Sequence, residues 1–188
     1  MTAQEVIEKC SHIPSSVYES EQEMWFDLIS KLDNPIIVDF GTGWGKSASS
    51  LGLSNSDAKV YTFDNGLPHL NAQRSKRKYI QEVLNYIQKS GAKNIVFQLG
   101  SSLEVPWHKP IDVLNIDSDH TYETTKAEIE RWLPFVKIGG YIFFHDYEHP
   151  RCPGVRQAID ELSNKYKLKL ERVTDAGAVK CAHYIKEI

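Results

Sequence analysis

The chain alternates short apolar runs with longer stretches in which apolar residues recur every three or four positions. A short apolar run bounded by turn residues is typical of a buried strand, and the wider spacing is typical of an amphipathic helix. Alternation of the two predicts β–α units around a parallel sheet with helices on both faces. We therefore expect an α/β fold that is doubly wound.

The pattern predicts five parallel strands and a terminal antiparallel pair. The predicted strands span residues 36–40, 60–64, 95–99, 111–117 and 141–145, followed by 168–174 and 178–186. Two helices come first, and further helices cover 46–53, 75–90, a stretch with Ile129, Trp132, Leu133 and Val136 that ends at Gly139-Gly140, and a stretch from Val155 to Tyr166. Asp175-Ala176-Gly177 supplies the turn of a C-terminal hairpin. The result is a seven-stranded, mostly parallel sheet with an antiparallel C-terminal strand.

Length and composition narrow the class of protein. The 188 residues fit one domain, 1–188, with N-terminal helices in 1–33 and the sheet-containing core in 34–188. The formal charge of -3 gives no reason to bind nucleic acid or an anionic membrane. The three cysteines are widely spaced, which argues against a disulfide framework. No apolar run approaches the ~20 residues that span a bilayer. We expect a cytoplasmic location.

The first predicted strand leads into a helix through Asp39-Phe40-Gly41-Thr42-Gly43-Trp44-Gly45. Glycine is needed where a chain turns sharply through positive φ and where a ligand approaches the backbone closely. The following helix begins with free N–H groups that favour electron-rich ligand atoms. In open α/β sheets such ligands bind at the carboxyl ends of the strands. The turn therefore predicts a site for a nucleoside-type cofactor.

Two other glycine-rich motifs match this turn only in part. The dinucleotide pattern GxGxxG needs glycine where this chain has Lys46, which disfavours a nicotinamide-dependent oxidoreductase. The P-loop pattern GxxxxGK[ST] matches Gly45-Lys46-Ser47 at its end and fails at Phe40, where it needs glycine. A P-loop-like nucleotide hydrolase and a cofactor-binding module without catalysis stay open as alternatives.

The spacing Asp39-x-Gly41-x-Gly43-x-Gly45 resembles the first motif of class I S-adenosylmethionine-dependent methyltransferases, which have a Rossmann-like fold. The resemblance implies that S-adenosyl-L-methionine is the cofactor. It further implies that Asp39 orders the methionine amino end of the cofactor. The cofactor would then lie against the backbone of Gly41, Thr42, Gly43 and Gly45.

Other strand ends extend the predicted cofactor site. Asp64 closes the second predicted strand, and a carboxylate there can accept two hydrogen bonds from ribose hydroxyls. The turn after the third strand, Gly100-Ser101-Ser102, meets adenine in similar enzymes. The expected cofactor contacts are therefore Asp64, Asn65, Ser101, Ser102 and, at the fourth strand, Asp117.

Acidic and imidazole side chains follow the fourth and fifth predicted strands. They are Asp117, Asp119, His120, His145 and Asp146. Neighbouring parallel strands bring their carboxyl ends together, so these side chains could converge in one cleft over the cofactor. Oxygen ligands suit Mg²⁺, and His145 admits Mn²⁺ or a similar metal. Such a metal would hold an acceptor hydroxyl and lower its pKa. The alternative is that these residues are helix N-caps and turn acids, with Asp119 or Thr121 capping the helix that follows.

A wider pattern narrows the resemblance. Asp-x-Asp-His-x-Tyr at 117–122, Trp-Leu-Pro at 132–134 and His-Asp-Tyr at 145–147 are similar to small-molecule O-methyltransferases, in particular metal-dependent macrocin-type sugar O-methyltransferases. By this resemblance Asp117 and Asp146 ligate the metal, and His145 departs from the pattern at a neighbouring ligand position. Asp119 looks like the general base, with His120 as second choice. With His145 in that position, the site could also catalyse methyl transfer without a metal.

The resemblance implies an enzyme that moves a methyl group to a hydroxyl oxygen of a small molecule, such as a sugar or natural-product acceptor. No nucleic-acid or membrane partner is expected. The N-terminal helices and the loop near 66–75 are the expected acceptor lid. A homodimer could supply further walls of the site.

Overall fold

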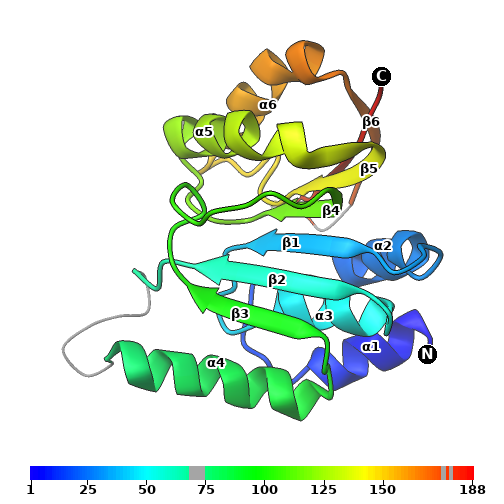
Figure 1. The fold of residues 1–188 in the computed structure, drawn as a ribbon, viewed down its shortest axis with the longest axis vertical. Helices are drawn as coiled ribbons and strands as arrows, with labels where there is room; N and C mark the ends of the chain where they lie inside the picture. The colour runs from blue at the N-terminus through cyan, green and yellow to red at the C-terminus, as the bar shows by residue number, and fades with distance from the viewer. Residues whose placement is uncertain (68–74, 175–176, 178–179) are drawn as a thin grey trace.

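The structure is a computed structural model that describes residues 1–67, 75–174, 177 and 180–188. Its centre is a seven-stranded sheet in the order β3-β2-β1-β4-β5-β7-β6 (Figure 1). The strands are β1 (Ile36–Phe40), β2 (Lys59–Asp64), β3 (Ile95–Leu99), β4 (Ile111–Ile116), β5 (Val136–Phe144), β6 (Leu168–Val173) and β7 (Ala182–Lys186). The first five strands pair in parallel, and β7 is antiparallel to both β5 and β6. The predicted fold class is confirmed.

Helices cover both faces of this sheet (Figure 1). They are α1 (Ala3–Cys10), α2 (Glu19–Ile29), α3 (Lys46–Ser54), α4 (Lys76–Ser90), α5 (Tyr122–Trp132) and α6 (Pro153–Tyr166). One apolar core lies between the sheet and α5 and α6, where Trp132 and Ile159 are fully buried. A second core lies between the opposite face and α2 and α3, around Trp25 and Leu51. Burial of these apolar side chains on two faces makes the chain doubly wound.

The fifth strand begins earlier than the helical stripe suggests. The stripe through Val136 and the stop at Gly139-Gly140 predict a helix up to that point, and this boundary is wrong. Helix α5 ends at Trp132 and a 3₁₀ turn, Leu133–Phe135, follows. Pro134 explains the end, because proline has no N–H to donate and its ring clashes with the preceding helical turn. Gly139, at a φ of 78°, lies within β5 beside an irregularity in its pairing with β4.

The remaining predicted boundaries agree within a few residues, and β1 and β3 agree at both ends. The C-terminal strands pair as the predicted hairpin. Residues 175–176 of its turn lie outside the described residues, while Gly177 has the positive φ of 72° that a turn glycine supplies. Most of the loop near 66–75, one of the two expected lids, also lies outside the described residues.

The strand order places one crevice at the carboxyl edge of the sheet. From β1 the chain proceeds outward to β2 and β3, and it then returns to the other side of β1 with β4 and β5. The connections from β1 and from β4 therefore leave the same edge in opposite directions, which opens a crevice between them. Ligands of doubly wound folds bind at this switch point. Asp64 and the segments after Phe40, Ile116 and Phe144 meet there.

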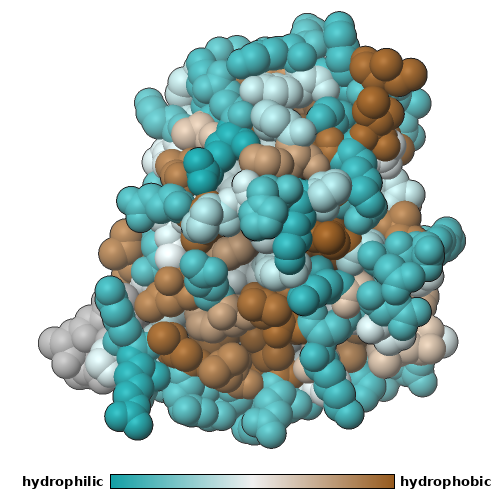
Figure 2. Space-filling model, in the orientation of Figure 1, coloured by the Kyte–Doolittle hydropathy of each residue, from teal (hydrophilic) through white to brown (hydrophobic). Residues whose placement is uncertain are grey.

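Apolar side chains reach the surface in more than one place in Figure 2, including a group beside the C-terminus. Figure 2 shows apolar side chains gathered over β2 and β3, below α5 and α6 in that view. Part of this half is covered by the loop before β4, in which Trp107 stacks edge-on against Tyr61 and Phe63. Trp107 therefore has a packing role. In the described part of the chain, no helix is long and apolar enough to cross a membrane.

Candidate active site

The glycine turn consists of three positions with positive φ, and each glycine is required for a different reason. A Cβ on Gly41 would lie 1.6 Å from the carbonyl oxygen of Asp117, so this glycine lets the ends of β1 and β4 touch. A Cβ on Gly45 would lie 2.7 Å from Ile87 of α4, so that glycine allows helix packing. A Cβ on Gly43 would have only one neighbour, at 4.0 Å. Gly43 is therefore the glycine that leaves space for a ligand.

Asp39 lies beneath the turn and is fully buried. Its carboxylate accepts hydrogen bonds from Ser47 at 3.1 Å, Thr62 at 2.7 Å and Asn115 at 2.8 Å. Burial raises the pKa of Asp39 to about 6, against the lowering effect of these bonds. The hydroxyl of Thr42 also turns inward, 2.5 Å from that of Thr62. Both residues thus hold the turn in place from below, and Asp39 does not line the cavities described next.

Asp64 joins the end of β2 to the glycine turn. One carboxylate oxygen accepts the backbone N–H of Gly43 at 2.8 Å, and the other accepts that of Gly66 at 2.5 Å. Each carboxylate oxygen has a further lone pair for a ligand hydroxyl. The side chain faces the crevice, where the predicted ribose acceptor is needed.

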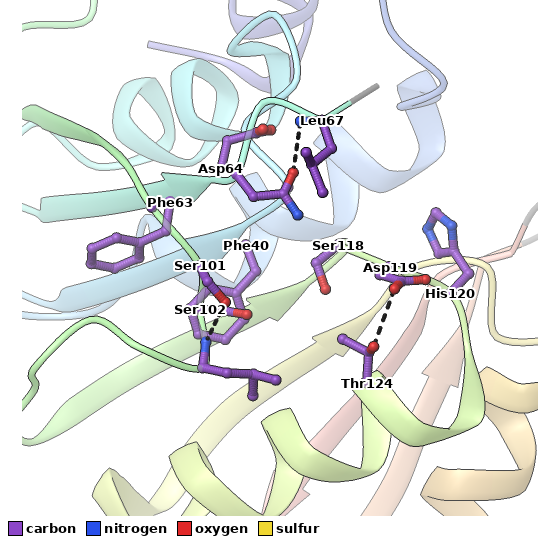
Figure 3. A pocket seen from close by; sticks show the side chains of 14 residues that line it. Phe40, Phe63, Asp64, Leu67, Ser101, Ser102, Ser118, Asp119, His120 and Thr124 are labelled. Carbon is purple, nitrogen blue, oxygen red and sulfur yellow. Dashed lines mark hydrogen bonds between the residues drawn. The ribbon is translucent and has the colours of Figure 1, made fainter. Parts of the chain in front are cut away.

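A cavity of about 540 Å³ lies at this edge of the sheet (Figure 3). Its walls come from the ends of β1, β2 and β4, the loop after β3 and the start of α5. The lining side chains include the predicted cofactor contacts Asp64, Asn65, Ser101 and Ser102, together with Phe40, Phe63, Leu67, Leu103, Asp119 and Thr124. The structure therefore brings the predicted adenosine contacts together around one cavity.

A second cavity of about 330 Å³ adjoins the first on the other side of the glycine turn. Four residues line both cavities: Gly41, Asp64, Ser118 and His120. The other walls of the second cavity are Pro14, Ser15, Ser16, Val17, Thr42, Gly43, Trp44, Ser47 and Asp117. The segment between α1 and α2 thus forms a wall, as expected of the N-terminal region. Trp44 also packs edge-on against Tyr79 and Tyr86.

The wall of the first cavity depends on an acid that the sequence analysis missed. Glu128 of α5 is fully buried, and its Oε1 accepts hydrogen bonds from the hydroxyls of Ser102 and, at 2.6 Å, Ser118. Burial raises the pKa of Glu128 to about 7. A signal existed, because Glu128 precedes Trp132 by four residues and therefore shares the buried face of the helix.

The predicted acid–imidazole cluster forms, with His120 as a full member. Asp117 Oδ1 lies 3.0 Å from His120 Nε2 and 3.1 Å from His145 Nδ1. Asp146 Oδ2 lies 3.0 Å and 3.1 Å from the same two nitrogens. Asp146 has a φ of 56°, unusual for a residue with a side chain. Two carboxylate oxygens and two ring nitrogens therefore converge, and each could ligate a metal ion.

Charges within the cluster shift its protonation. Burial alone would lower the pKa of His145. The negative charge of Asp117 and the close contacts with the carboxylates of Asp117 and Asp146 outweigh burial and raise this pKa well above its usual value. The hydrogen bond to Asp117 raises the pKa of His120. Burial would raise the pKa of Asp117, but the two imidazoles lower it to about 2. Both carboxylates thus stay ionised, and loss of the imidazole protons leaves a donor set suited to a divalent cation.

Asp119 lies outside this cluster. Its side chain is exposed and accepts hydrogen bonds from the backbone N–H of Thr121 at 3.3 Å and from the hydroxyl of Thr124 at 3.1 Å. Figure 3 shows it turned toward Thr124 at the start of α5. The N-cap of α5 is Thr121, whose hydroxyl accepts the backbone N–H of Thr124, and Asp119 orders the turn just before it while also lining the first cavity.

A second acid missed from the sequence stands behind the cluster. Glu21 of α2 is 1% exposed, and its Oε1 lies 3.5 Å from Nε2 of His145. Its Oε2 accepts the backbone N–H of Tyr18 at 2.8 Å. The local sequence shows only a residue in the first turn of a helix, where acids are common. Its approach to β5 depends on how α2 packs against the sheet.

The P-loop alternative conflicts with this geometry. In a P-loop the hydroxyl after the lysine binds Mg²⁺. Here the corresponding hydroxyl of Ser47 is buried and donates to Asp39.

Comparisons with known proteins agree with the site. Residues 38–147, more than half of the chain, match a family model described as a methyltransferase domain. The chain is 25% identical over 186 residues to the rhamnosyl O-methyltransferase of Mycobacterium tuberculosis (strain ATCC 25618 / H37Rv), which covers 90% of this chain and 74% of that protein.

Solved structures share the fold. An O-methyltransferase from Bacillus cereus in complex with SAH superposes with a TM-score of 0.69 at 16% identity, covering 98% of this chain and 90% of that one. An rRNA methylase from Streptococcus thermophilus superposes with a TM-score of 0.64 at 19% identity, covering 88% of this chain and 96% of that one. The predicted resemblance to small-molecule O-methyltransferases is confirmed, and the comparisons support none of the alternatives. The chain belongs to the methyltransferase-domain family and is an S-adenosylmethionine-dependent methyltransferase.

Proposed function

We propose that the protein transfers the methyl group of S-adenosylmethionine to a hydroxyl oxygen of a sugar-containing small molecule, at the boundary between the two cavities. One observation carries the proposal: the cavities share His120, and this imidazole is held by two carboxylates at that boundary. The similarity to a rhamnosyl O-methyltransferase supports a sugar hydroxyl as the acceptor.

The residues present fit the methyl donor. A cavity of 540 Å³ is within the ~300–1,000 Å³ range of small-molecule sites. Asp64 offers the ribose hydroxyls a carboxylate, and the serines after β3 offer polar contacts to the adenine. The open space beside Gly43 admits the methionine portion to the turn, and the nearby carboxylates of Asp64 and Asp117 attract its positive sulfonium and amino groups. In this proposal Asp39 acts from below, by holding the turn.

The cluster fits a divalent metal held by Asp117, His145 and Asp146. The fit rests on His145, whose ring nitrogens are both buried without a hydrogen-bond partner among the described residues, while Nδ1 faces two carboxylate oxygens. Three protein ligands leave coordination positions free, as in catalytic sites. When bound, the metal would orient the acceptor hydroxyl and lower its pKa.

His120 is the better candidate for the general base, ahead of Asp119. Both carboxylates of the cluster contact Nε2 of His120, which orients the ring and leaves Nδ1 to take a proton. As the acceptor C–O–methyl bond forms and the methyl–sulfur bond breaks, His120 takes the hydroxyl proton. S-adenosylhomocysteine leaves as a neutral thioether, so the charge lost at sulfur is balanced by the proton gained at the imidazole. Positioning and proton removal supply most of what this in-line transfer needs.

The acceptor occupies the part of the second cavity that lies against the segment between α1 and α2, beside the methionine portion of the donor. Ser15 and Ser16 can hydrogen-bond sugar hydroxyls, and Trp44 and Pro14 provide apolar faces. The loop between α1 and α2 is then part of the acceptor lid. The remaining part expected of the lid, near 66–75, stays a prediction.

Two measurements test the proposed function. In calorimetry, S-adenosylmethionine and S-adenosylhomocysteine should bind with one site per chain, and ATP should not bind. In an activity assay with labelled methyl groups, Mg²⁺ or Mn²⁺ and a panel of glycosides, label should appear on a sugar oxygen. ATP binding would favour the hydrolase alternative. Cofactor binding without transfer to any acceptor of the panel would favour the module without catalysis.

A further inference from the structure

We propose that Glu21 of α2 is an outer carboxylate of the metal centre, that it fixes His145 as a nitrogen ligand, and that the centre therefore selects Mn²⁺ or Zn²⁺ over Mg²⁺. This inference rests on the metal in the proposed function. Its new content is the role of the N-terminal helix and the preference among metals.

Burial is the first observation. The side chains of Glu21 and His145 are 1% and 2% exposed. In the described residues, Glu21 Oε1 and both nitrogens of His145 lack a hydrogen-bond partner of normal geometry. A buried polar atom left unsatisfied costs about 1–3 kcal/mol, so a cation bound at Nδ1, between the two aspartates, and a hydrogen bond from Nε2 to Glu21 would together satisfy all three atoms.

The orientation of the ring is the second observation. Nδ1 of His145 lies 3.1 Å from an oxygen of Asp117 and 3.1 Å from an oxygen of Asp146, while Nε2 lies 3.5 Å from Glu21. A metal-binding histidine usually donates its other ring N–H to a carboxylate, which fixes the tautomer and makes the ligand more basic. Glu21 is the carboxylate that stands 3.5 Å from Nε2, so it would accept this N–H once a metal holds the lone pair of Nδ1 between the two aspartates.

The spacing of the atoms is the third observation. Ligand atoms at ~2.0–2.2 Å from an ion lie roughly 3.0 Å from one another in octahedral geometry and roughly 3.4 Å in tetrahedral geometry. The oxygens of Asp117 and Asp146 lie 3.1 Å from the nitrogen of His145. Asp146 is held there with its backbone at a φ of 56°, and such strain is typical of functional sites.

Chemistry decides the metal. Mg²⁺ prefers oxygen ligands and water, whereas imidazole suits Zn²⁺, and Mn²⁺, although it also favours oxygen ligands, accepts an imidazole among them. A third carboxylate in place of His145 would give an oxygen site. The imidazole shifts the preference away from Mg²⁺, and Glu21 strengthens the shift by raising the basicity of the imidazole.

The experiment measures binding of Mn²⁺, Zn²⁺ and Mg²⁺ to the full chain after chelation, by calorimetry, together with pulsed electron paramagnetic resonance of the Mn²⁺ form. We expect one Mn²⁺ or Zn²⁺ per chain, Mg²⁺ at least ~100-fold weaker, and ¹⁴N modulation from an imidazole. Glu21→Gln should weaken Mn²⁺ binding by about 10–100-fold. Glu23→Gln makes the same change at an exposed position of α2 and should leave affinity unchanged.

Three results would overturn the inference: Mg²⁺ binding as tightly as Mn²⁺, absence of nitrogen modulation, or equal metal affinity of the Glu21→Gln and Glu23→Gln variants. A His145→Ala variant that keeps the nitrogen signal would also overturn it. None of these readouts needs turnover, so the proposed function is tested separately. Methyl transfer by the chelated protein would contradict the metal centre and leave the transferase intact. Tight Mn²⁺ binding without methyl transfer would support the metal centre and contradict the proposed transferase activity.

Discussion

Asp64 accepts a hydrogen bond from the backbone N–H of Gly43 at 2.8 Å, which ties the end of β2 to the turn after β1. The two groups proposed to hold opposite parts of the methyl donor are therefore one unit before any ligand binds. A preorganised site of this kind loses less conformational entropy on binding than a mobile one.

Asp64→Asn should weaken S-adenosylhomocysteine binding by about 10–100-fold, because hydrogen bonds to a charged group contribute ~1.5–3 kcal/mol. Calorimetry on the variant measures the change. Asp57→Asn is the matched control, since Asp57 is exposed and precedes β2 at the opposite edge of the sheet. Unchanged affinity of the Asp64 variant would remove Asp64 from the cofactor site.

Two glycine substitutions should have different consequences, one mainly for cofactor binding and the other mainly for stability. Gly43→Ala meets no close protein atom, so it should fold with a cost of about 1–2 kcal/mol for its positive φ. It should still weaken cofactor binding, because the added methyl enters the cavity. Gly41→Ala places Cβ 1.6 Å from a backbone oxygen and should lower the melting temperature far more. Thermal unfolding and calorimetry separate the two, and equal melting temperatures would contradict this account of the turn.

His120→Ala should lower turnover by about 10²–10⁴-fold while cofactor affinity changes only a few-fold, as for loss of a general base. Asp119→Asn should keep most of the turnover, because Asp119 mainly orders the start of α5. Single-turnover methyl transfer and calorimetry on both variants measure these effects. If Asp119→Asn loses as much turnover as His120→Ala, Asp119 takes the role that the sequence pattern first assigned to it.

The fold was predictable because its signals are local. Apolar runs and glycine or proline positions set most strand and helix bounds, and the β–α alternation set the sheet. The exception between Trp132 and Val136 has a local cause too, since apolar spacing continued across Pro134 while the backbone changed from helix to strand. A hydrophobic stripe does not distinguish the two when a buried strand follows a buried helix directly.

The site was predictable only in its first layer. Residues at strand ends, such as Asp64 and Asp117, share one edge because parallel strands end together. Glu21 and Glu128 support that layer from helices, and their partners are distant in sequence: His145 for one, and a serine from a neighbouring loop for the other. Such pairings depend on helix packing angles, which a single sequence does not show.

Glu128 should make stability depend on pH. Its pKa is about 7 in the folded protein against an ordinary value of 4.5, so the folded state holds a proton that the unfolded chain has lost in this interval. The free energy of unfolding should therefore fall as pH rises from 4.5 to 7, by up to about 3 kcal/mol from this group. Below 4.5 both states are protonated, so this group gives no further dependence on pH and its stabilisation is at its maximum.

Glu128→Gln removes this titration and keeps an oxygen for Ser102 and Ser118. We expect the variant to match the natural protein near pH 5 and to exceed its stability at pH 8 by about 1–2 kcal/mol, since the new amide N–H groups lack a buried partner and offset part of the gain. Urea unfolding at both pH values measures the difference, with Glu123→Gln, exposed on the same helix, as control. A variant less stable than the natural protein at pH 8 would mean that the ionised carboxylate stabilises the fold, and that burial does not dominate its pKa.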